Sequence, residues 1–412
     1  MKILHTADWH LGKSIEGRER QEEQIKVMDE ICQIADEEQI DLVLIAGDIY
    51  QTVNPPAWAE NLFYETIHRL SDYGKRGVIV ISGNHDQPER IKAANPLADK
   101  QGIYLVGMPT DQLQPSIFTR DGQVIVKDAG IGWLQLNLPK KNESAMVSVL
   151  PYPSESRIKQ LFTQSYDSKE IRKAYSEFIG KWYTAQESLF KKDTVNLAMS
   201  HLFVQGGSAS DSEIEIQVGG AYTVEPNHLP SYVQYVALGH LHRPQAVKGT
   251  PSLTRYAGSP LAYSFSEANH KKSVTILDLK PGGTAEPYEI PLRSGNPLIA
   301  KDFVNGIIEF ETWIEEDGKN PAWLDITLHV PHPLSMEEIT RIRKMHDGII
   351  HIRVLTPELE EALNTITTNS KDPAELFHKF YQFKVGAEPN REVVQLFLEL
   401  FQQQEEEMGD EE

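Results

Sequence analysis

Residues 77–86 read GVIVISGNHD, a short apolar run that ends in the polar residues Asn84, His85 and Asp86. Four other apolar runs end in side chains of metal-binding types, and these read Asp8-Trp9-His10, Gly47-Asp48, Ser200-His201 and Gly239-His240-Leu241-His242. Such widely spaced side chains can meet only if the runs are neighbouring strands of one sheet. The pattern therefore predicts an α/β fold and a binuclear metal site together.

Helical patterns separate these runs along the first part of the chain. Ile25, Met28 and Ile31, for example, recur at helical spacing. Strands are predicted at residues 3–4, 41–46, 77–81, 194–199 and 233–238. This alternation predicts a first domain, residues 1–279, with helices on the faces of its sheet. Residues 108–194 contain a strand-like stretch at 123–126 and a helical one at 169–190, and we assign them no role.

The pattern of predicted strands and helices changes after Lys280-Pro281-Gly282-Gly283, residues that suit a hinge. Strands are predicted at 306–312, 325–330 and 348–354, and a helix at 335–346. These elements would form a small separate α/β domain, residues 284–365. Two more helical patterns, 372–383 and 390–404, lie in a C-terminal region, residues 366–412, that ends in an acidic tail. The second pattern has a broad apolar face, which could pack on its own chain or dock on a partner.

Composition narrows the class of protein. The chain has 412 residues, 40% hydrophobic and 24% charged, which is typical of a soluble globular protein. Its only cysteine, Cys32, cannot form a disulfide within the chain, so a reducing cytoplasm fits best. We find no signal peptide and no run near the ~18 apolar residues that a transmembrane helix needs. We therefore expect a cytoplasmic protein without membrane residence.

The net charge is −20, and six acidic residues among the last eight supply part of it. Proteins that bind nucleic acid alone are usually basic, because neutralising phosphates releases counterions. Taken alone, the charge argues against tight DNA binding. Lys13, Arg18, Arg20 and Arg243 lie near the ligand loops and could contact phosphates, although solvated surface charges are more common.

The ligand types suit transition metals. Carboxylates, imidazoles and one amide fit Mn²⁺, Fe²⁺ or Zn²⁺ better than Mg²⁺. Asp8 and His10 are two residues apart on what we expect to be an extended segment, so both side chains would leave on one side, and the same holds for His240 and His242. We assign one ion to Asp8, His10, Asp48 and His242, and the other to Asp48, Asn84, His201 and His240. Two such ions can clamp a phosphoryl group.

Two residues beside Asn84 are candidate catalytic groups. His85 could protonate the leaving oxygen or stabilise the charged transition state, because histidines titrate near neutrality. Asp86 could orient an imidazole, or it could simply cap the following helix; both readings are open. A single histidine is more often structural than functional, but five strand ends with enough ligands for two ions favour a metal site.

The order of these motifs resembles that of the calcineurin-like metallophosphoesterases. Beyond the ligands, residues 5–12 (HTADWHLG), 46–50 (AGDIY), 239–245 (GHLHRPQ) and 256–261 (YAGSPL) are similar to those of bacterial nuclease subunits in this family. The similarity covers nearly the whole chain and is strongest over residues 1–270. It implies a sheet sandwich flanked by helices, followed by a small capping domain and C-terminal helices.

The resemblance also implies an activity. It points to a Mn²⁺-dependent 3′–5′ double-strand exonuclease and single-strand endonuclease that opens DNA hairpins. The small domain would cap DNA, the last helices would bind a coiled-coil ATPase, and residues 57–73 and 87–98 would form a homodimer. Gln51 stands where archaeal and eukaryotic relatives carry a histidine, so an exonuclease role of that histidine does not carry over.

Other functions fit the sequence less well. Phosphoprotein phosphatases carry an arginine after the Gly-Asp motif and a glutamate after Gly-Asn-His, whereas this chain has Ile49 to Thr52 and Asp86 there. Small-molecule phosphodiesterases rarely need a further domain and terminal helices. A scaffold with an inactive site generally lacks ligands, and all are present here. We infer that an acidic nuclease of this kind holds DNA weakly and that the ATPase supplies most phosphate contacts.

Overall fold

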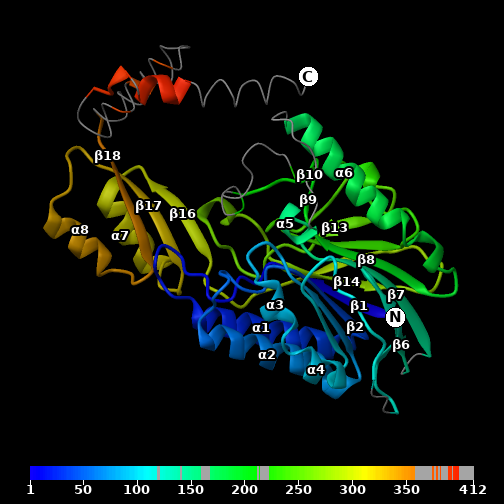
Figure 1. Ribbon diagram of the computed structural model, residues 1–412. Coiled ribbons are helices and arrows are strands. Elements are labelled where there is room, and N and C mark those ends of the chain that lie inside the picture. Colours follow the sequence, from blue (N-terminus) through cyan, green and yellow to red (C-terminus); the bar gives the residue numbers. More distant parts are fainter. Residues whose placement is uncertain are drawn as a thin grey trace. The chain divides into compact units, whose positions relative to one another are not determined.

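The computed structural model shown in Figure 1 places the chain in two compact units, Met1–Pro297 and Leu298–Glu412. It describes residues 1–117, 121–139, 142–158, 168–210, 213, 222–357, 374, 377–378, 381, 388–391 and 393–398. No helix among them is long and apolar enough to cross a membrane.

The first unit contains two large sheets. The first sheet has the strand order β15-β14-β1-β2-β3-β4, in which β1 to β4 run parallel and β14 and β15 are antiparallel additions at one edge. Its strands are β1 (Lys2–Thr6), β2 (Leu42–Ala46), β3 (Gly77–Ile81), β4 (Ile103–Val106), β14 (Ser273–Asp278) and β15 (Tyr288–Pro291).

The second sheet has the order β12-β13-β11-β8-β7-β6-β5, and its central strands β7, β8, β11 and β13 are parallel. Its strands are β5 (Ile125–Gly130), β6 (Trp133–Leu138), β7 (Glu143–Leu150), β8 (Val195–His201), β11 (Tyr235–Gly239), β12 (Gln245–Ala246) and β13 (Thr254–Tyr256). Two short parallel strands, β9 (Phe203–Val204) and β10 (Thr223–Val224), form a separate small sheet. Both come between β8 and β11 along the chain.

The two sheets pack face to face, with helices outside (Figure 1). Leu42 and Leu44 of β2 face the second sheet and pack in one core with Leu197 of β8, while Val43 and Ile45 lie in the core beneath α1 and α2. Every residue of β2 is buried, as expected for a parallel strand covered on both faces. A helix on the far face of the second sheet, α6, completes four layers.

Among its described residues, this unit has the helices α1 (Gln21–Glu37), α2 (Ala57–Leu70), α3 (Pro88–Lys92), α4 (Asn95–Ala98), α5 (Glu155–Ile158) and α6 (Ser168–Thr184). Short 3-10 turns are η1 (Asp72–Gly74), η2 (Asp99–Gln101), η3 (Glu187–Leu189), η5 (Pro226–His228) and η6 (Phe265–Glu267). The predicted strands correspond to β1, β2, β3, β8 and β11, and the helical pattern that includes Ile25, Met28 and Ile31 lies in α1.

The segment 108–194 differs from its expectation. Besides the helix α6 it supplies three neighbouring strands of the second sheet, β5, β6 and β7. We predicted only the start of β5, because a strand-length apolar run does not by itself show periodicity. The first unit also continues past the expected boundary at residues 279–284, since β15 pairs with β14.

The second unit contains a parallel three-stranded sheet, β16-β17-β18, with two helices. Its elements are β16 (Leu298–Phe303), α7 (Gly306–Glu316), β17 (Trp323–His329), α8 (Met336–Arg343) and β18 (Ile349–Leu355). The prediction of a strand at 306–312 was wrong: these residues begin α7. Phe310 and Ile314 are four residues apart and both buried, so tertiary packing outweighs the β-propensity of the isoleucines.

The predicted C-terminal helices lie largely outside the described residues. Residues 393–398 are helical, and the ring of Phe397 stacks on that of Phe377 with centroids 4.2 Å apart. Leu396 is 57% exposed. In the described part of the second predicted helix, Phe397 thus contacts an aromatic ring of the first predicted helix, and Leu396 lies in solvent.

Candidate binuclear metal centre

The predicted ligands meet at the carboxyl ends of strands from both sheets. Asp8, Asp48 and Asn84 follow β1, β2 and β3 of the first sheet, whereas His201 ends β8 and His240 follows β11 of the second. The expectation that all the strands belong to one sheet was therefore wrong. Parallel strands in two stacked sheets can still converge at one edge, because the face-to-face packing brings β2 beside β8 and β11.

One group of side chains gathers around His10. Its Nε2 lies 3.0 Å from Nε2 of His242 and 3.7 Å from Oδ2 of Asp48. All three side chains are buried. These are three of the four residues assigned to one ion, and they supply two imidazole nitrogens and a carboxylate oxygen.

A second group gathers around Asn84. Its Oδ1 lies 2.8 Å from Nε2 of His201 and 3.0 Å from Nδ1 of His240. Oδ2 of Asp48 is 3.3 Å from the same nitrogen of His201. Asp48 therefore stands between the two groups, as a carboxylate that bridges two ions must. Asp8 approaches His201 as well, with 3.8 Å between Oδ1 and Nδ1.

The donor set fits divalent cations. Potential ligand atoms of Asp8, Asp48 and His201 lie within 4.8 Å of one another, as do those of His10, Asp48 and His85. Among the described residues, Oδ2 of Asp8 and Nδ1 of His10 are buried without a hydrogen-bond partner. Buried polar atoms of this kind are costly unless something satisfies them. A cation would satisfy the carboxylate of Asp8.

The pKa values favour the neutral, metal-binding form for two of the histidines, His10 and His240. Burial holds the pKa of His10 well below its usual range, and burial together with His201 lowers the pKa of His240 to about 3. Burial also disfavours charge on His201, but the carboxylates of Asp48 and Asp8 outweigh it and raise its pKa to about 9. In the metal-free protein, His201 therefore carries the charge that balances Asp48.

The backbone at the ligands is not extended. Asp8, His10, Asp48 and His240 have positive φ values of 53°, 45°, 50° and 108°. The expectation that the spacing of Asp8 and His10, or of His240 and His242, lies on extended chain was wrong, because β1 and β11 end before these residues. Non-glycine residues in this region cost energy and cluster at functional sites.

A glycine makes room for the Asp48 carboxylate. A Cβ atom at Gly83 would overlap both the carboxylate and the backbone nitrogen of Asp48. The Gly-Asn-His-Asp motif thus needs glycine at its first position because the loop after β3 touches the loop after β2.

His85 is held against the centre by two hydrogen bonds. Its backbone N–H donates to Oδ1 of Asp48 over 2.9 Å, and its ring Nδ1 lies 2.9 Å from the carbonyl oxygen of Gln51. A carbonyl can only accept, so Nδ1 carries a proton and Nε2 is the nitrogen available for proton transfer. The ring centroid is 4.9 Å from that of His10.

Asp86 has neither of the roles considered from the sequence. Its carboxylate accepts hydrogen bonds from the backbone N–H groups of Ile49, Tyr50 and Gly83, at 2.8 to 3.1 Å, and the N-cap of α3 is Gln87. Burial and the neighbouring Asp48 raise its pKa to about 6. Asp86 thus joins the loop after β2 to the loop after β3 and contacts no imidazole through these bonds.

Several residues around the centre were missed from the sequence. Glu267 lies 3.6 Å from Nδ1 of His242 and forms a buried ion pair with Lys272, whose Nζ also donates to the His242 carbonyl at 2.8 Å. Glu213 accepts a hydrogen bond from the backbone N–H of His242. These residues lie in loops, and no spacing rule marks them. Only the nearby stretch 256–261 drew attention to this region.

The cations near the ligand loops divide into two kinds. Arg20 is buried in an ion pair with Glu23 at 2.8 Å, so it is not the solvated surface charge that was the more common alternative, and its guanidinium already has a carboxylate partner. Arg18 and Arg243 are exposed, and Lys13 lies 5.1 Å from the ring centre of Tyr263. Only these three remain candidates among the four.

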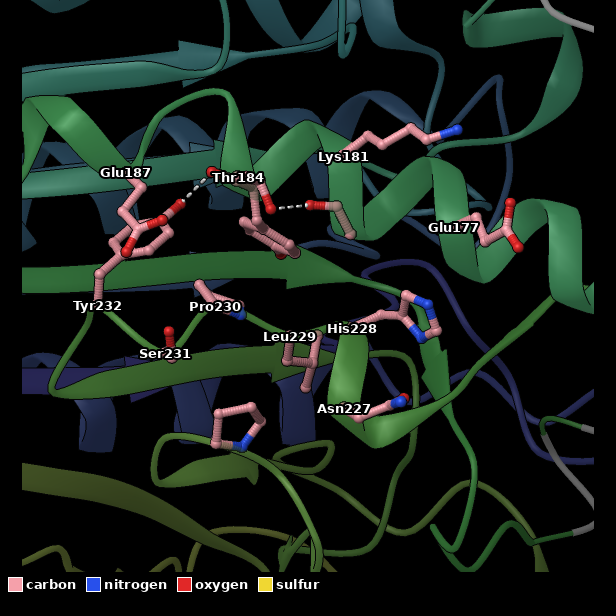
Figure 2. Close-up of a pocket in the computed structure, with 13 residues that line it drawn as sticks. Glu177, Lys181, Thr184, Glu187, Asn227, His228, Leu229, Pro230, Ser231 and Tyr232 are labelled. Atoms are coloured by element: carbon pink, nitrogen blue, oxygen red, sulfur yellow. Dashed lines mark hydrogen bonds between the residues drawn. The ribbon is translucent and has the colours of Figure 1, made fainter.

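A cavity of about 460 Å³ lies elsewhere, between α6 and the segment that follows β10 (Figure 2). Figure 2 shows Glu177 and Lys181 of α6 on one side and Asn227 and His228 on the other. None of the predicted ligands lines it. The metal centre and this cavity are therefore separate features of the first unit.

Two stacked sheets between helices, with a cluster of Asp, His and Asn side chains at their strand ends, define a metallophosphoesterase. The family model for calcineurin-like phosphoesterases matches residues 1–244, and that for the type 5 capsule protein repressor C-terminal domain matches residues 300–385. The D subunit of nuclease SbcCD from Bacillus subtilis (strain 168) is 46% identical over 408 residues, covering 99% of each chain. The chain belongs to the calcineurin-like phosphoesterases and, within them, to the family of SbcCD nuclease D subunits.

A second relative agrees with this placement. The corresponding SbcCD nuclease protein from Staphylococcus epidermidis (strain ATCC 12228 / FDA PCI 1200) is 28% identical over 386 residues, or 93% of each chain. Both similarities extend across the two units, so they include the second unit as well as the metal centre.

Proposed function

We propose that this chain is the nuclease subunit of an SbcCD-type complex and cleaves phosphodiester bonds in DNA with two divalent ions, which we take to be Mn²⁺. The observation that carries the proposal is the position of Asp48 between His10 on one side and His201 on the other. A carboxylate in that position can join two ions into one centre, and two such ions together can clamp a phosphoryl group.

We propose the ligand sets named from the sequence, and the distances among His10, Asp48 and His242 and among Asp48, Asn84, His201 and His240 support them. Asp8, His10, Asp48 and His242 would hold one ion, and Asp48, Asn84, His201 and His240 the other. When bound, the two ions supply Lewis acidity toward a phosphate and lower the pKa of water. The histidines and carboxylates of the chain set where that chemistry occurs, because the loops that carry them are fixed to both sheets.

His85 is the proposed general acid. The carbonyl of Gln51 holds the proton on Nδ1, and the backbone bond to Asp48 fixes the residue beside the proposed ligands. A protonated Nε2 could then donate to the oxygen that leaves the phosphorus. His85 is partly exposed, whereas His10 and His201 are buried, so it is the histidine that a substrate can reach.

The substrate and partners are proposed from the family. We take the activities to be 3′–5′ exonucleolytic on double strands and endonucleolytic on single strands and hairpins, in the cytoplasm, with an SbcC-type coiled-coil ATPase bound by the C-terminal helices. The second unit would cap the DNA. Tyr73 and Leu97 of the predicted dimer segments are 69% and 72% exposed, which supports a homodimer through them.

One experiment separates the nuclease from the small-molecule phosphodiesterase. The purified chain is given Mn²⁺ and either an end-labelled hairpin oligonucleotide or bis-p-nitrophenyl phosphate, with and without the ATPase partner and ATP. We expect the hairpin to be opened and the duplex to be shortened from its 3′ ends. Turnover of the small ester with intact DNA in every condition would favour the alternative. The Asp48→Asn variant should be inactive on both substrates.

A further inference from the structure

Arg157 joins the second sheet to the loop that carries Asn84 and His85. It belongs to α5, which follows β7, in the part of the chain to which the sequence assigned no chemistry. Its Nη1 donates to the carbonyl oxygen of Gly83 at 2.7 Å, and its Nη2 donates to the carbonyl oxygen of Asp86 at 2.8 Å. Nη1 also approaches Oγ of Ser82 at 3.3 Å.

These two carbonyl groups stand on either side of the Asn84-His85 pair. One belongs to the residue directly before Asn84 and the other to the residue directly after His85. A guanidinium group is planar, and its donors have a fixed separation. When each end of the group binds one carbonyl, the distance across the two intervening residues is set by the guanidinium as well as by the loop.

Tyr152 holds Arg157 in this position. The guanidinium lies over the Tyr152 ring, 5.3 Å from its centre, and the backbone N–H of Tyr152 donates to the Ser82 carbonyl at 3.0 Å. The Tyr152 ring is in turn 6.2 Å from the ring of His201. The segment 152–157 therefore contacts the loop after β3 through the backbone, through a ring and through a charged side chain.

Within the part of the chain that the structure describes, Arg157 forms no ion pair with a carboxylate. Among the described residues its hydrogen bonds go to two carbonyl oxygens and one hydroxyl. Burial lowers its pKa, while Asp86 and Asp48 act in the opposite direction. A partly buried cation with uncharged partners is costly. We therefore explain the position of Arg157 by its effect on the geometry of the Gly83–Asp86 loop rather than by a contribution to the free energy of unfolding.

The loop has other supports that do not depend on Arg157. Asp86 accepts three backbone hydrogen bonds, and the N–H of His85 donates to Asp48. Loss of Arg157 should therefore leave the loop folded while allowing Asn84 and His85 to shift. Small displacements matter here, because a misplacement of about 1 Å at a reacting group can cost a factor of 100 in rate.

We propose that Arg157 is a positioning residue, which clamps the Gly83–Asp86 loop so that Asn84 faces the metal centre and His85 faces the substrate. This inference rests on the proposed function, because Asn84 is a proposed ligand and His85 the proposed acid. Arg157 itself binds the backbone of the loop and acts through these two residues.

The test compares Arg157→Gln and Arg157→Lys with Arg76→Gln. Arg76 is a matched control: it too donates to two backbone carbonyls, those of Ile40 and Leu70, but it precedes β3, whereas the metal centre follows that strand. The measurements are the thermal unfolding midpoint, Mn²⁺ affinity of the metal-free full chain by calorimetry, and kcat and KM for bis-p-nitrophenyl phosphate.

For Arg157→Gln we expect a folded protein, Mn²⁺ affinity lower by about tenfold at one of two sites, and kcat lower by tenfold or more with KM changed less. Arg157→Lys should recover part of each loss, because an ammonium reaches one carbonyl. Arg76→Gln should lower the unfolding midpoint but leave kcat and Mn²⁺ affinity within about twofold of the wild type.

Three results would overturn the inference. Wild-type Mn²⁺ affinity and kcat in Arg157→Gln would show that the clamp has no effect on the centre. Equal losses in Arg76→Gln would show that the effect is general destabilisation. A wild-type chain that neither binds Mn²⁺ nor cleaves the ester would reject the proposed function, and the inference with it. A wild-type chain that does both, beside an unaffected Arg157→Gln, rejects only the inference.

Discussion

Nε2 of His10 lies 3.0 Å from Nε2 of His242, although 232 residues separate the two along the chain. Burial holds the pKa of His10 well below its usual range, so the ring is neutral at pH 7. Nδ1 of His10 is buried without a hydrogen-bond partner in the described structure. A proton placed on either nitrogen therefore leaves the pair poorly satisfied, whereas one cation can be bound by both rings.

Binding of Mn²⁺ should consequently stabilise the fold. At a free concentration 100 times Kd, the free energy of unfolding should rise by about 2.7 kcal/mol, seen as a higher melting temperature than in EDTA. His242→Gln should lose most of this shift, and His228→Gln, at the separate cavity of Figure 2, should keep it. Equal melting temperatures with and without Mn²⁺ would contradict a metal centre.

Replacing His85 should separate metal binding from catalysis. His85→Gln keeps the backbone hydrogen bond to Asp48 but removes the proton donor. We expect the bound Mn²⁺ content to be unchanged and kcat on a hairpin oligonucleotide to fall by a factor of about 10² to 10⁴. Metal content is measured by elemental analysis of the same sample. An unchanged cleavage rate would remove His85 from the mechanism.

The stability of the metal-free protein should depend on pH through His201. Its pKa of about 9 lies above the ordinary value of 6.5, because the carboxylates of Asp48 and Asp8 outweigh the effect of burial. The stabilisation is therefore complete below pH 6.5 and is lost as the pH rises through 9. In EDTA, we expect the free energy of unfolding to fall over this window by an amount on the order of 3 kcal/mol.

Denaturant titrations between pH 6 and 10 measure this fall. His201→Gln should flatten the profile. His5→Gln is the matched control, since burial lowers the pKa of His5 to about 3 and it does not titrate in the window. A profile that is flat for the wild type, or that stays steep in His201→Gln, would assign the titration to another group.

Much of the centre could be predicted because its ligands follow strands. Asp48 and His240 come within two residues of a strand end, and short apolar runs are visible in a sequence. The family resemblance implied a sheet sandwich, but the apolar runs alone could not show two sheets, since they do not say which strands pair with one another. The positive φ values of Asp8 and His10 could not be predicted either. Residue type and spacing favour an extended segment there, and neither indicates a strained backbone.

The supporting residues were out of reach for a different reason. Their contacts form only when loops that are far apart in the sequence meet in the folded protein; these residues are Glu267, Arg157 and Glu213. In the second unit, the β-propensity of the isoleucines in α7 predicted a strand, but the residues form a helix that buries Phe310. Local preference fails where tertiary contacts supply most of the free energy.

Glu267 should raise the affinity of the centre for Mn²⁺ through its contact with the ring of His242. It lies 3.6 Å from Nδ1 of His242 and is paired with the buried Lys272. Glu267→Gln keeps the size of the side chain but removes the charge that favours a basic Nε2, so Mn²⁺ affinity should fall by about 10- to 100-fold. Calorimetry on metal-free protein measures this. The control is Glu289→Gln, because Glu289 is an exposed carboxylate paired with Arg255. This variant should bind Mn²⁺ as the wild type does.

The isolated chain should bind DNA weakly despite its function. Its net charge is −20, and two cations near the centre are already neutralised, Arg20 by Glu23 and Lys272 by Glu267. These two side chains are therefore not available to bind phosphates and release counterions from a duplex. In fluorescence anisotropy with a labelled duplex at physiological salt and without Mn²⁺, we expect a Kd of about 10⁻⁶ M or weaker, and tighter binding once the ATPase partner is added. Nanomolar binding by the chain alone would mean that the exposed Arg18 and Arg243, with the second unit, hold the DNA without help.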